Sequence, residues 1–99
     1  MHARATISGT TIADTDSFEF VEGNVYFPVS SVVDREKTLT PGSRTSHCPW
    51  KGDGKYYDLH VNGQTIANAA WYYPAPYEKA KMIKDCVAFD KSKVTVGKD

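Results

Sequence analysis

The chain lacks any run of about 18 apolar residues, which is the length that a membrane-spanning helix needs. Its first residues, MHARATISG, lack the apolar stretch of a secretory signal peptide. It also lacks an excess of either charge, because 12 Lys and Arg balance 12 Asp and Glu. A dedicated nucleic-acid-binding protein would carry a basic stripe instead. We therefore expect a cytoplasmic protein that binds neither membranes nor nucleic acid.

Cysteine and histidine are scarce. Among 99 residues there are two cysteines, Cys48 and Cys86, and three histidines. The chain has no CxxC, HExxH or HxH spacing, so we expect neither a metal site nor a cofactor. Two cysteines are also too few for a small domain held together by disulfides. Both thiols are therefore expected to be free.

Turn-forming residues punctuate the chain at short intervals, a pattern typical of a β-rich domain. The clearest strand spans residues 56–62, where apolar and polar side chains alternate, and the turn Asn62-Gly63 leads to a returning strand at 64–73. Further strands are expected at residues 3–7, 11–13, 18–21, 25–27, 87–89 and 93–96. Because 99 residues suit one core, the sequence predicts a mainly β, single-domain fold over residues 1–99, built on a small antiparallel sheet.

One short helix is expected, near the C terminus. Tyr77, Ala80 and Ile83 recur at a three-residue spacing, and Pro76 suits a first helical turn. Residues 34–37 form a charge run that is typical of a surface loop or a single helical turn. Residues 40–55 contain two prolines and three glycines, so we predict an irregular loop there.

The segment His47-Cys48-Pro49-Trp50-Lys51-Gly52 is the most unusual part of the chain. A tryptophan in such a loop is rarely free in water, so Trp50 is expected to anchor the loop. An anchored loop that carries a thiol, an imidazole and an ammonium group is a common design for a functional site. Cys48 is the candidate catalytic residue, because a neighbouring cation raises its thiolate fraction. The alternative is that Cys48 fills the core and Trp50 acts as a plug.

Lys51 and Arg44 are candidate anion ligands. Gly52 and Gly54 allow backbone N–H groups to approach an anion closely, and an arginine binds an anion through two parallel hydrogen bonds. The alternative is that Lys51 caps a sheet edge or solvates the turn.

Aromatic residues make up 12% of the chain. Most must lie in the core, and Trp71 is expected to be largely buried. Tyrosine hydroxyls also orient ligands in pockets, so part of this inventory can line a site. The candidate ligand-binding residues are Tyr26, Arg44, His47, Cys48, Trp50, Lys51, Trp71 and Tyr72.

Two acidic patterns have both a chemical and a structural interpretation. Asp58 precedes His60 by two residues, so it either orients His60 as a base or shares a polar strand face with it. Asp14-Thr15-Asp16 resembles a metal-binding pair, but its position after a short hairpin favours a turn.

Three blocks of sequence resemble a known family: VEGNVYFP at 21–28, TSHCPWKG at 45–52 and AWYYPAP at 70–76, together with Ile83 and residues 87–89. They are similar to family 427 of the domains of unknown function, over nearly the whole chain. The resemblance implies a β-tent domain, an architecture also found in methionine sulfoxide reductase B and some Rab-binding zinc proteins. Those relatives bind zinc through paired CxxC motifs, so a metal-free version is implied here. The family carries a nucleotidyltransferase-like label, but no motif supports it and no catalytic residues transfer with it.

Three functions remain open. The first is the binding of a small ligand, with an anion as one option, between the Cys48–Gly52 loop and an aromatic sheet face. The second is a nucleotidyltransferase-like enzyme, in which Lys51 and Arg44 hold the anion. The third is a protein-interaction module that uses exposed aromatic residues. The sequence leaves the oligomeric state open.

Overall fold

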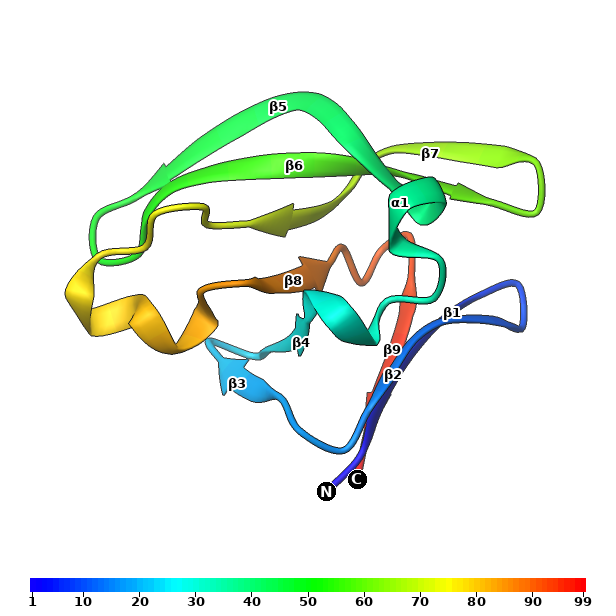
Figure 1. The fold of residues 1–99 in the computed structure, drawn as a ribbon, viewed down its shortest axis with the longest axis horizontal. Helices are drawn as coiled ribbons and strands as arrows, with labels where there is room; N and C mark the ends of the chain where they lie inside the picture. The colour runs from blue at the N-terminus through cyan, green and yellow to red at the C-terminus, as the bar shows by residue number, and fades with distance from the viewer.

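The computed structural model describes residues 1–99 and consists of strands joined by tight turns, with three short helical segments (Figure 1). The elements, in chain order, are β1 (Ala3–Ile7), β2 (Thr10–Thr15), β3 (Glu19–Val21), β4 (Asn24–Pro28), the 3-10 helix η1 (Val29–Ser31), α1 (Arg35–Thr38), β5 (Leu39–Cys48), β6 (Gly52–Val61), β7 (Gln64–Tyr72), the 3-10 helix η2 (Glu78–Ile83), β8 (Cys86–Phe89) and β9 (Thr95–Lys98).

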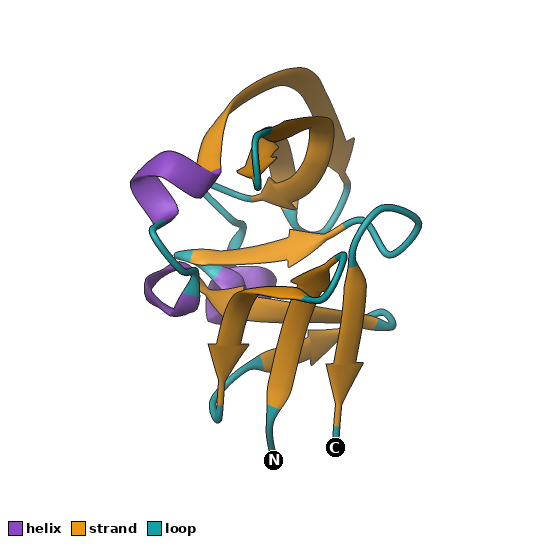
Figure 2. Ribbon diagram, turned by 90° about the vertical axis from the view of Figure 1, so that its right-hand side faces the viewer, coloured by secondary structure: helices purple, strands orange, loops and turns teal.

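The strands form two sheets in which every pairing is antiparallel. The smaller sheet has the order β2-β1-β9, and the larger has the order β3-β4-β8-β7-β6-β5. Figure 2 shows the small sheet in front, with its strands crossing those of the large sheet behind it at a steep angle. Both termini lie side by side at the end of the small sheet. The predicted mainly β, antiparallel fold is confirmed.

Tight turns with the same backbone conformation close two of the hairpins. Asn62 and Gly63 have φ angles of 52° and 76°, and Glu22 and Gly23 have φ angles of 52° and 80°. Two consecutive residues at positive φ match the right-handed twist of the flanking strands, and Asn and Gly adopt this conformation at low cost. The turn at residues 22–23 fixes the position of the Glu22 side chain.

Each face of the large sheet carries a cluster of buried residues. One face packs against the small sheet through a cluster of 16 buried residues, in which Phe27 and Phe89 meet edge to face at 5.4 Å between ring centroids. The other face carries a smaller buried cluster that includes Ala80 and Ile83 of η2. Alternation along each strand therefore sends neighbouring side chains to two different environments.

The prediction of an irregular loop at residues 40–55 is wrong. Most of this segment belongs to β5 and β6, which form a long hairpin (Figure 1). Pro41 is tolerated because β5 is the outer strand of the sheet and needs no inward N–H there. Neighbouring side chains leave little room at Gly54, since an added Cβ would lie 2.6 Å from Ser46 Oγ and 3.2 Å from the Tyr73 ring. Proline and glycine usually interrupt strands, but Pro41 and Gly54 are compatible with these strands because of their tertiary surroundings.

The expected helix near the C terminus is present as the 3-10 helix η2, with Ala80 and Ile83 buried. The three-residue spacing is the natural period of a 3-10 helix, which explains why so short a segment showed it. The charge run at residues 34–37 takes the second of its two expected forms, because residues 35–37 belong to the single helical turn α1. The structure adds η1, which was not predicted. None of these helical segments has the length and apolar character needed to cross a bilayer.

The N-terminal strand is held by a charged cluster. The two ring nitrogens of His2 contact the carboxylates of Asp14 and Asp16, and Arg4 Nε donates to Asp14 at 3.0 Å. The hydrogen bond with Asp16, helped by the charges of both carboxylates, raises the pKa of His2 above its ordinary value. The Asp14-Thr15-Asp16 pattern thus serves to bind His2 and Arg4.

This cluster predicts a pH dependence of stability. Because the pKa of His2 is raised in the folded protein, its contribution is full below about pH 6.5 and is lost as the pH rises through the folded pKa. The variant His2→Gln should therefore flatten the fall in melting temperature between about pH 6 and pH 9. Thermal unfolding across this range measures the effect, and a variant that follows the unmodified protein at every pH would contradict it.

Candidate functional site

Six of the eight candidate residues gather on the face of the large sheet that also contacts η2. Register explains this gathering, because Tyr56 is paired with Trp71 and Trp71 with Ala88, so their side chains share one face. Cys48, Trp50 and Trp71 pack against the buried cluster that contains Tyr26 and Tyr73. The gathered candidates are Tyr26, Arg44, Cys48, Trp50, Lys51 and Trp71.

A continuous strip of aromatic rings runs across this face, with a cation at its open end. The guanidinium carbon of Arg44 lies 5.3 Å from the centroid of the Tyr56 ring. The Tyr56 and Trp71 centroids are 6.2 Å apart, and Trp71 Nε1 donates to Tyr26 Oη at 3.1 Å. We call Arg44, Tyr56 and Trp71 the Arg44 strip. Tyr56 and Trp71 are half-buried and Arg44 is exposed, so each of the three presents part of its surface to solvent, and Trp71 is less buried than the sequence predicted.

Asn68 sets the position of Arg44. Its side-chain oxygen accepts hydrogen bonds from the backbone N–H groups of Ser43 and Arg44, both at 3.1 Å. Gly42 makes room for this oxygen, because an added Cβ would lie only 2.5 Å from it. The backbone beneath Arg44 is therefore fixed by β7, two strands away in the sheet.

Lys51 forms the buried end of the face. Only 7% of the residue is exposed, and its ammonium group binds the carboxylate of Glu22 and lies 5.2 Å and 5.7 Å from the ring centroids of Trp50 and Tyr73. Burial alone lowers the pKa of Lys51, but the hydrogen bond to Glu22, together with Tyr26 and Tyr73, outweighs burial and raises it. Lys51 is therefore a charged side chain whose partner comes from the β3–β4 turn.

Backbone contacts hold the loop that carries Lys51. The N–H of Tyr77 donates to the carbonyl of Lys51 at 2.9 Å. Gly52 has a φ of 108°, a conformation that side chains rarely adopt, and a Cβ there would lie 3.5 Å from the Tyr77 ring. Trp50 is half-buried against the aromatic cluster. The loop is thus anchored at the position expected from its tryptophan.

The Lys51–Glu22 pair gives an asymmetric mutational prediction. In Lys51→Met, an apolar chain of similar length replaces the ammonium between two aromatic rings, so the free energy of unfolding should change by less than about 1.5 kcal/mol. Glu22→Gln should be more destabilising, because it leaves a buried ammonium without its carboxylate. Urea unfolding of both variants at neutral pH ranks them. If Lys51→Met were the more destabilising variant, the aromatic rings alone would be sufficient to stabilise the buried ammonium of Lys51.

The other two candidates lie elsewhere. His47 Nδ1 is 2.7 Å from Asp53 Oδ1, and the His47 ring lies 6.5 Å from that of Tyr77. Tyr72 stacks on Tyr57 at 4.4 Å, on the opposite face of the sheet from Trp71. Alternation along β7 accounts for Tyr72, because adjacent residues of a strand point to opposite faces.

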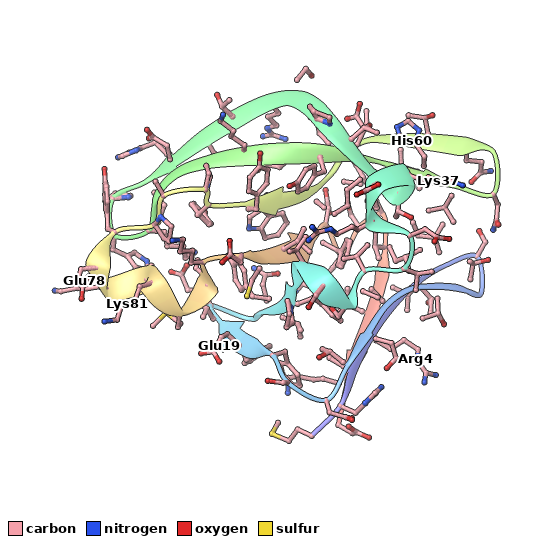
Figure 3. The ribbon with its side chains drawn as sticks, in the orientation of Figure 1. Arg4, Glu19, Lys37, His60, Glu78 and Lys81 are labelled. Atoms are coloured by element: carbon pink, nitrogen blue, oxygen red, sulfur yellow. The ribbon has the colours of Figure 1, made fainter.

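The interpretation of Asp58 as the orienting partner of His60 is wrong. His60 instead contacts the hydroxyls of Thr40 at 2.6 Å and Thr65 at 3.0 Å, while Asp58 accepts from the backbone N–H of Asn68 at 2.8 Å. Figure 3 shows His60 near α1, at the end of the molecule remote from η2. The polar strand face is therefore the correct reading.

Sequence reasoning missed three members of the face: Glu22, Tyr56 and Tyr73. No local pattern links Glu22 to Lys51, which is 29 positions away. Tyr73 is buried, which is the main reason why its pKa is raised. Strand alternation was the one available signal for Tyr56 and Tyr73, because both share the face of their neighbours two positions away. Both free thiols lie at the edge of this aromatic cluster, and burial raises the pKa of Cys86.

The fold and the face define a small antiparallel β domain with an aromatic surface bounded by two cations. A family model described as a domain of unknown function (DUF427), with the label NTP_transf_9, matches residues 1–99. The chain belongs to this family. No curated protein matches the chain at a significant level.

Proposed function

We propose that this domain binds a small anionic ligand with a flat, unsaturated part, and that the ligand lies on the Arg44 strip. The observation that carries the proposal is the guanidinium of Arg44 over the Tyr56 ring, next to the half-buried Trp71. Aromatic rings offer a stacking surface, and a guanidinium offers a planar grip on a carboxylate or phosphate. The strip thus presents both groups to one ligand.

Arg44 is the better anion ligand of the two cations that the sequence suggested. Lys51 already binds Glu22 and is enclosed by Trp50 and Tyr73. Arg44 is exposed and forms no ion pair. Its donors are therefore free for a ligand, and the contact with Asn68 means that its backbone needs no ordering when the ligand binds.

The Cys48–Gly52 loop takes a supporting role in this proposal. Trp50 and Lys51 pack directly against the aromatic cluster, so the loop closes one end of the face. Through Tyr26, which accepts the hydrogen bond from Trp71, this end fixes the orientation of the indole. A preorganised indole costs less entropy on binding than a mobile one.

The test is the loss of anion binding in Arg44→Gln. The probes are ATP, AMP and inorganic pyrophosphate, and binding is followed by titration calorimetry and by quenching of tryptophan fluorescence. Loss of a charge-assisted hydrogen-bond pair should weaken Kd by roughly ten- to hundredfold. AMP should bind more tightly than its phosphate group alone, because only the nucleotide can stack.

The matched control is Lys55→Gln, which also removes one exposed positive charge from the same hairpin. Lys55 is next to Tyr56 in β6, so its side chain points to the other face. This variant should bind as the unmodified protein does. Equal losses in both variants would mean that only net charge matters, and an absence of binding by every probe would refute the proposal.

The enzyme alternative is kept because the same strip suits a nucleotide: a base would stack on Trp71 while Arg44 binds phosphate. Release of pyrophosphate from ATP in the presence of Mg²⁺, lost in Arg44→Gln, would favour a nucleotidyltransferase-like activity over binding alone. A stable protein partner, together with no response to any small anion, would favour the interaction module.

A further inference from the structure

A separate cavity of about 210 Å³ lies between η1, the middle of β6, the end of β7 and the start of β8. Its walls are mostly apolar and come from segments far apart in the chain, including Val29 of η1 and Pro74 after β7. Tyr57 and Tyr72 also line it, and both point away from the face that carries Tyr56 and Trp71. Tyr73, a member of the buried aromatic cluster, also lines the cavity, but Arg44, Tyr56 and Trp71 do not, so the cavity is distinct from the Arg44 strip.

Two stacked tyrosines form one wall of the cavity. The Tyr57 and Tyr72 rings are 4.4 Å apart and inclined by only 14°. Burial is the main cause that raises the pKa of Tyr57, with Tyr72 adding to it, so the hydroxyl stays protonated at neutral pH. A rigid pair of rings with a neutral hydroxyl offers contact area together with a hydrogen bond that fixes orientation.

The charge around the cavity is mainly negative. Asp85 and Cys86 both belong to the lining. The pKa of the Cys86 thiol is raised first by burial and then by the negative charges of Glu19 and Asp85. The positive charge of Arg35, in α1, lowers the pKa of Tyr57 but is outweighed by burial. The field near Cys86 therefore disfavours anions and favours hydrogen-bond donors.

We propose that this cavity is a second binding site, for a neutral or cationic single-ring ligand that bears a hydrogen-bond donor, such as a phenol or an aromatic amine. Size supports one ring, because a cavity of about 150 Å³ lined by apolar side chains holds benzene. The apolar walls take the ring, and Asp85 accepts from its donor group. The site prefers the opposite charge to the Arg44 strip and does not depend on it.

The two free thiols supply the measurement. Cys86 lines the cavity, whereas Cys48 does not, so Cys48 is an internal control. Iodoacetamide labelling is followed for each thiol by peptide mass spectrometry at about pH 8.5, where the raised pKa of Cys86 still permits reaction. Millimolar p-cresol should slow the labelling of Cys86 at least threefold and leave Cys48 unchanged. The anion 4-methylbenzoate, which carries a carboxylate where p-cresol has its hydroxyl, should protect neither thiol.

Two variants with the same chemical change locate the effect. Val29→Phe fills the cavity and should abolish protection by p-cresol, whereas Val33→Phe adds the same ring at an exposed position, 48% accessible, and should preserve it. Tyr72→Leu, which removes one wall of the stack, replaces Val29→Phe if the latter does not fold and should likewise abolish protection.

The proposal is overturned if p-cresol protects neither thiol, protects both equally, or still protects Cys86 when the cavity is filled. Protection by 4-methylbenzoate equal to that by p-cresol would also overturn it, because the charge preference would be absent. Arg44→Gln should leave protection by p-cresol intact, so failure of the Arg44 strip as an anion site and failure of this cavity are told apart.

Discussion

Replacing Trp71 with alanine is expected to lower the free energy of unfolding by about 3 kcal/mol, the lower end of the range for a buried aromatic residue. Trp71 is half-buried, so its removal opens a smaller void than a fully enclosed ring would. The variant also leaves Tyr26 Oη, deep in the aromatic cluster, without the indole N–H that it accepts. Ligand binding on the Arg44 strip should be lost along with the stacking surface.

Denaturant unfolding measures the stability change, and the AMP titration measures the loss of binding. Trp71→Phe helps to separate the two effects, because it keeps a stacking ring while removing the hydrogen bond to Tyr26 and part of the packed ring surface, at a cost of about 1–2 kcal/mol. Phe20→Ala, at a ring that is 53% exposed, is the control for an aromatic truncation outside the cluster and should cost less than Trp71→Ala. A Trp71→Ala variant as stable as Phe20→Ala would show that the cluster does not depend on the indole.

Replacing Gly42 with alanine is expected to cost about 1–3 kcal/mol and also to weaken anion binding, although Gly42 touches no ligand in the proposal. The new Cβ would lie 2.5 Å from Asn68 Oδ1 and 3.1 Å from the backbone oxygen of Tyr56. Asn68 would have to release the N–H groups of Ser43 and Arg44, so the guanidinium would lose its fixed base. The loss of affinity should approach that of Arg44→Gln.

Gly97→Ala is the matched control, because a Cβ at that position meets nothing within 4 Å and the backbone there does not have a positive φ. It should leave both stability and affinity unchanged within about 0.5 kcal/mol. Chemical denaturation and calorimetry with AMP test the pair of glycines together. A Gly42→Ala variant that binds normally would separate the Asn68 contact from the function of Arg44.

The hairpins could be predicted because their information is local. Alternation over residues 56–62 and the Asn62-Gly63 turn act within a few positions, and the structure shows both. The courses of β5 and of the start of β6 could not be predicted, since Gly42 and Gly54 resemble loop residues until Asn68 and Tyr73 are placed beside them. Local composition indicates which backbone conformations a residue permits. These glycines are required for another reason, because side chains from other parts of the chain leave no room for a Cβ.

The candidate site divides in the same way. Cys48, Trp50 and Lys51 adjoin one another in sequence, so an anchored loop with reactive groups was visible there. The carboxylate that binds Lys51 was not visible, because ion pairs between distant turns leave no periodic trace. Alternation alone could predict that Trp71 and Tyr72 lie on opposite faces of the sheet, since neighbouring residues in a strand point in opposite directions.

The interrupted outer strand β5 also bears on how the protein avoids self-association. An exposed strand of ten residues is a template for pairing with a second chain, and aggregation commonly begins at such edges. Pro41 offers no N–H to an incoming strand, and between Pro41 and Thr45 the register shifts while Asn68 takes two backbone donors. Only short stretches on either side remain regular. The bend that positions Arg44 thus also breaks up an edge that would otherwise invite intermolecular β-pairing.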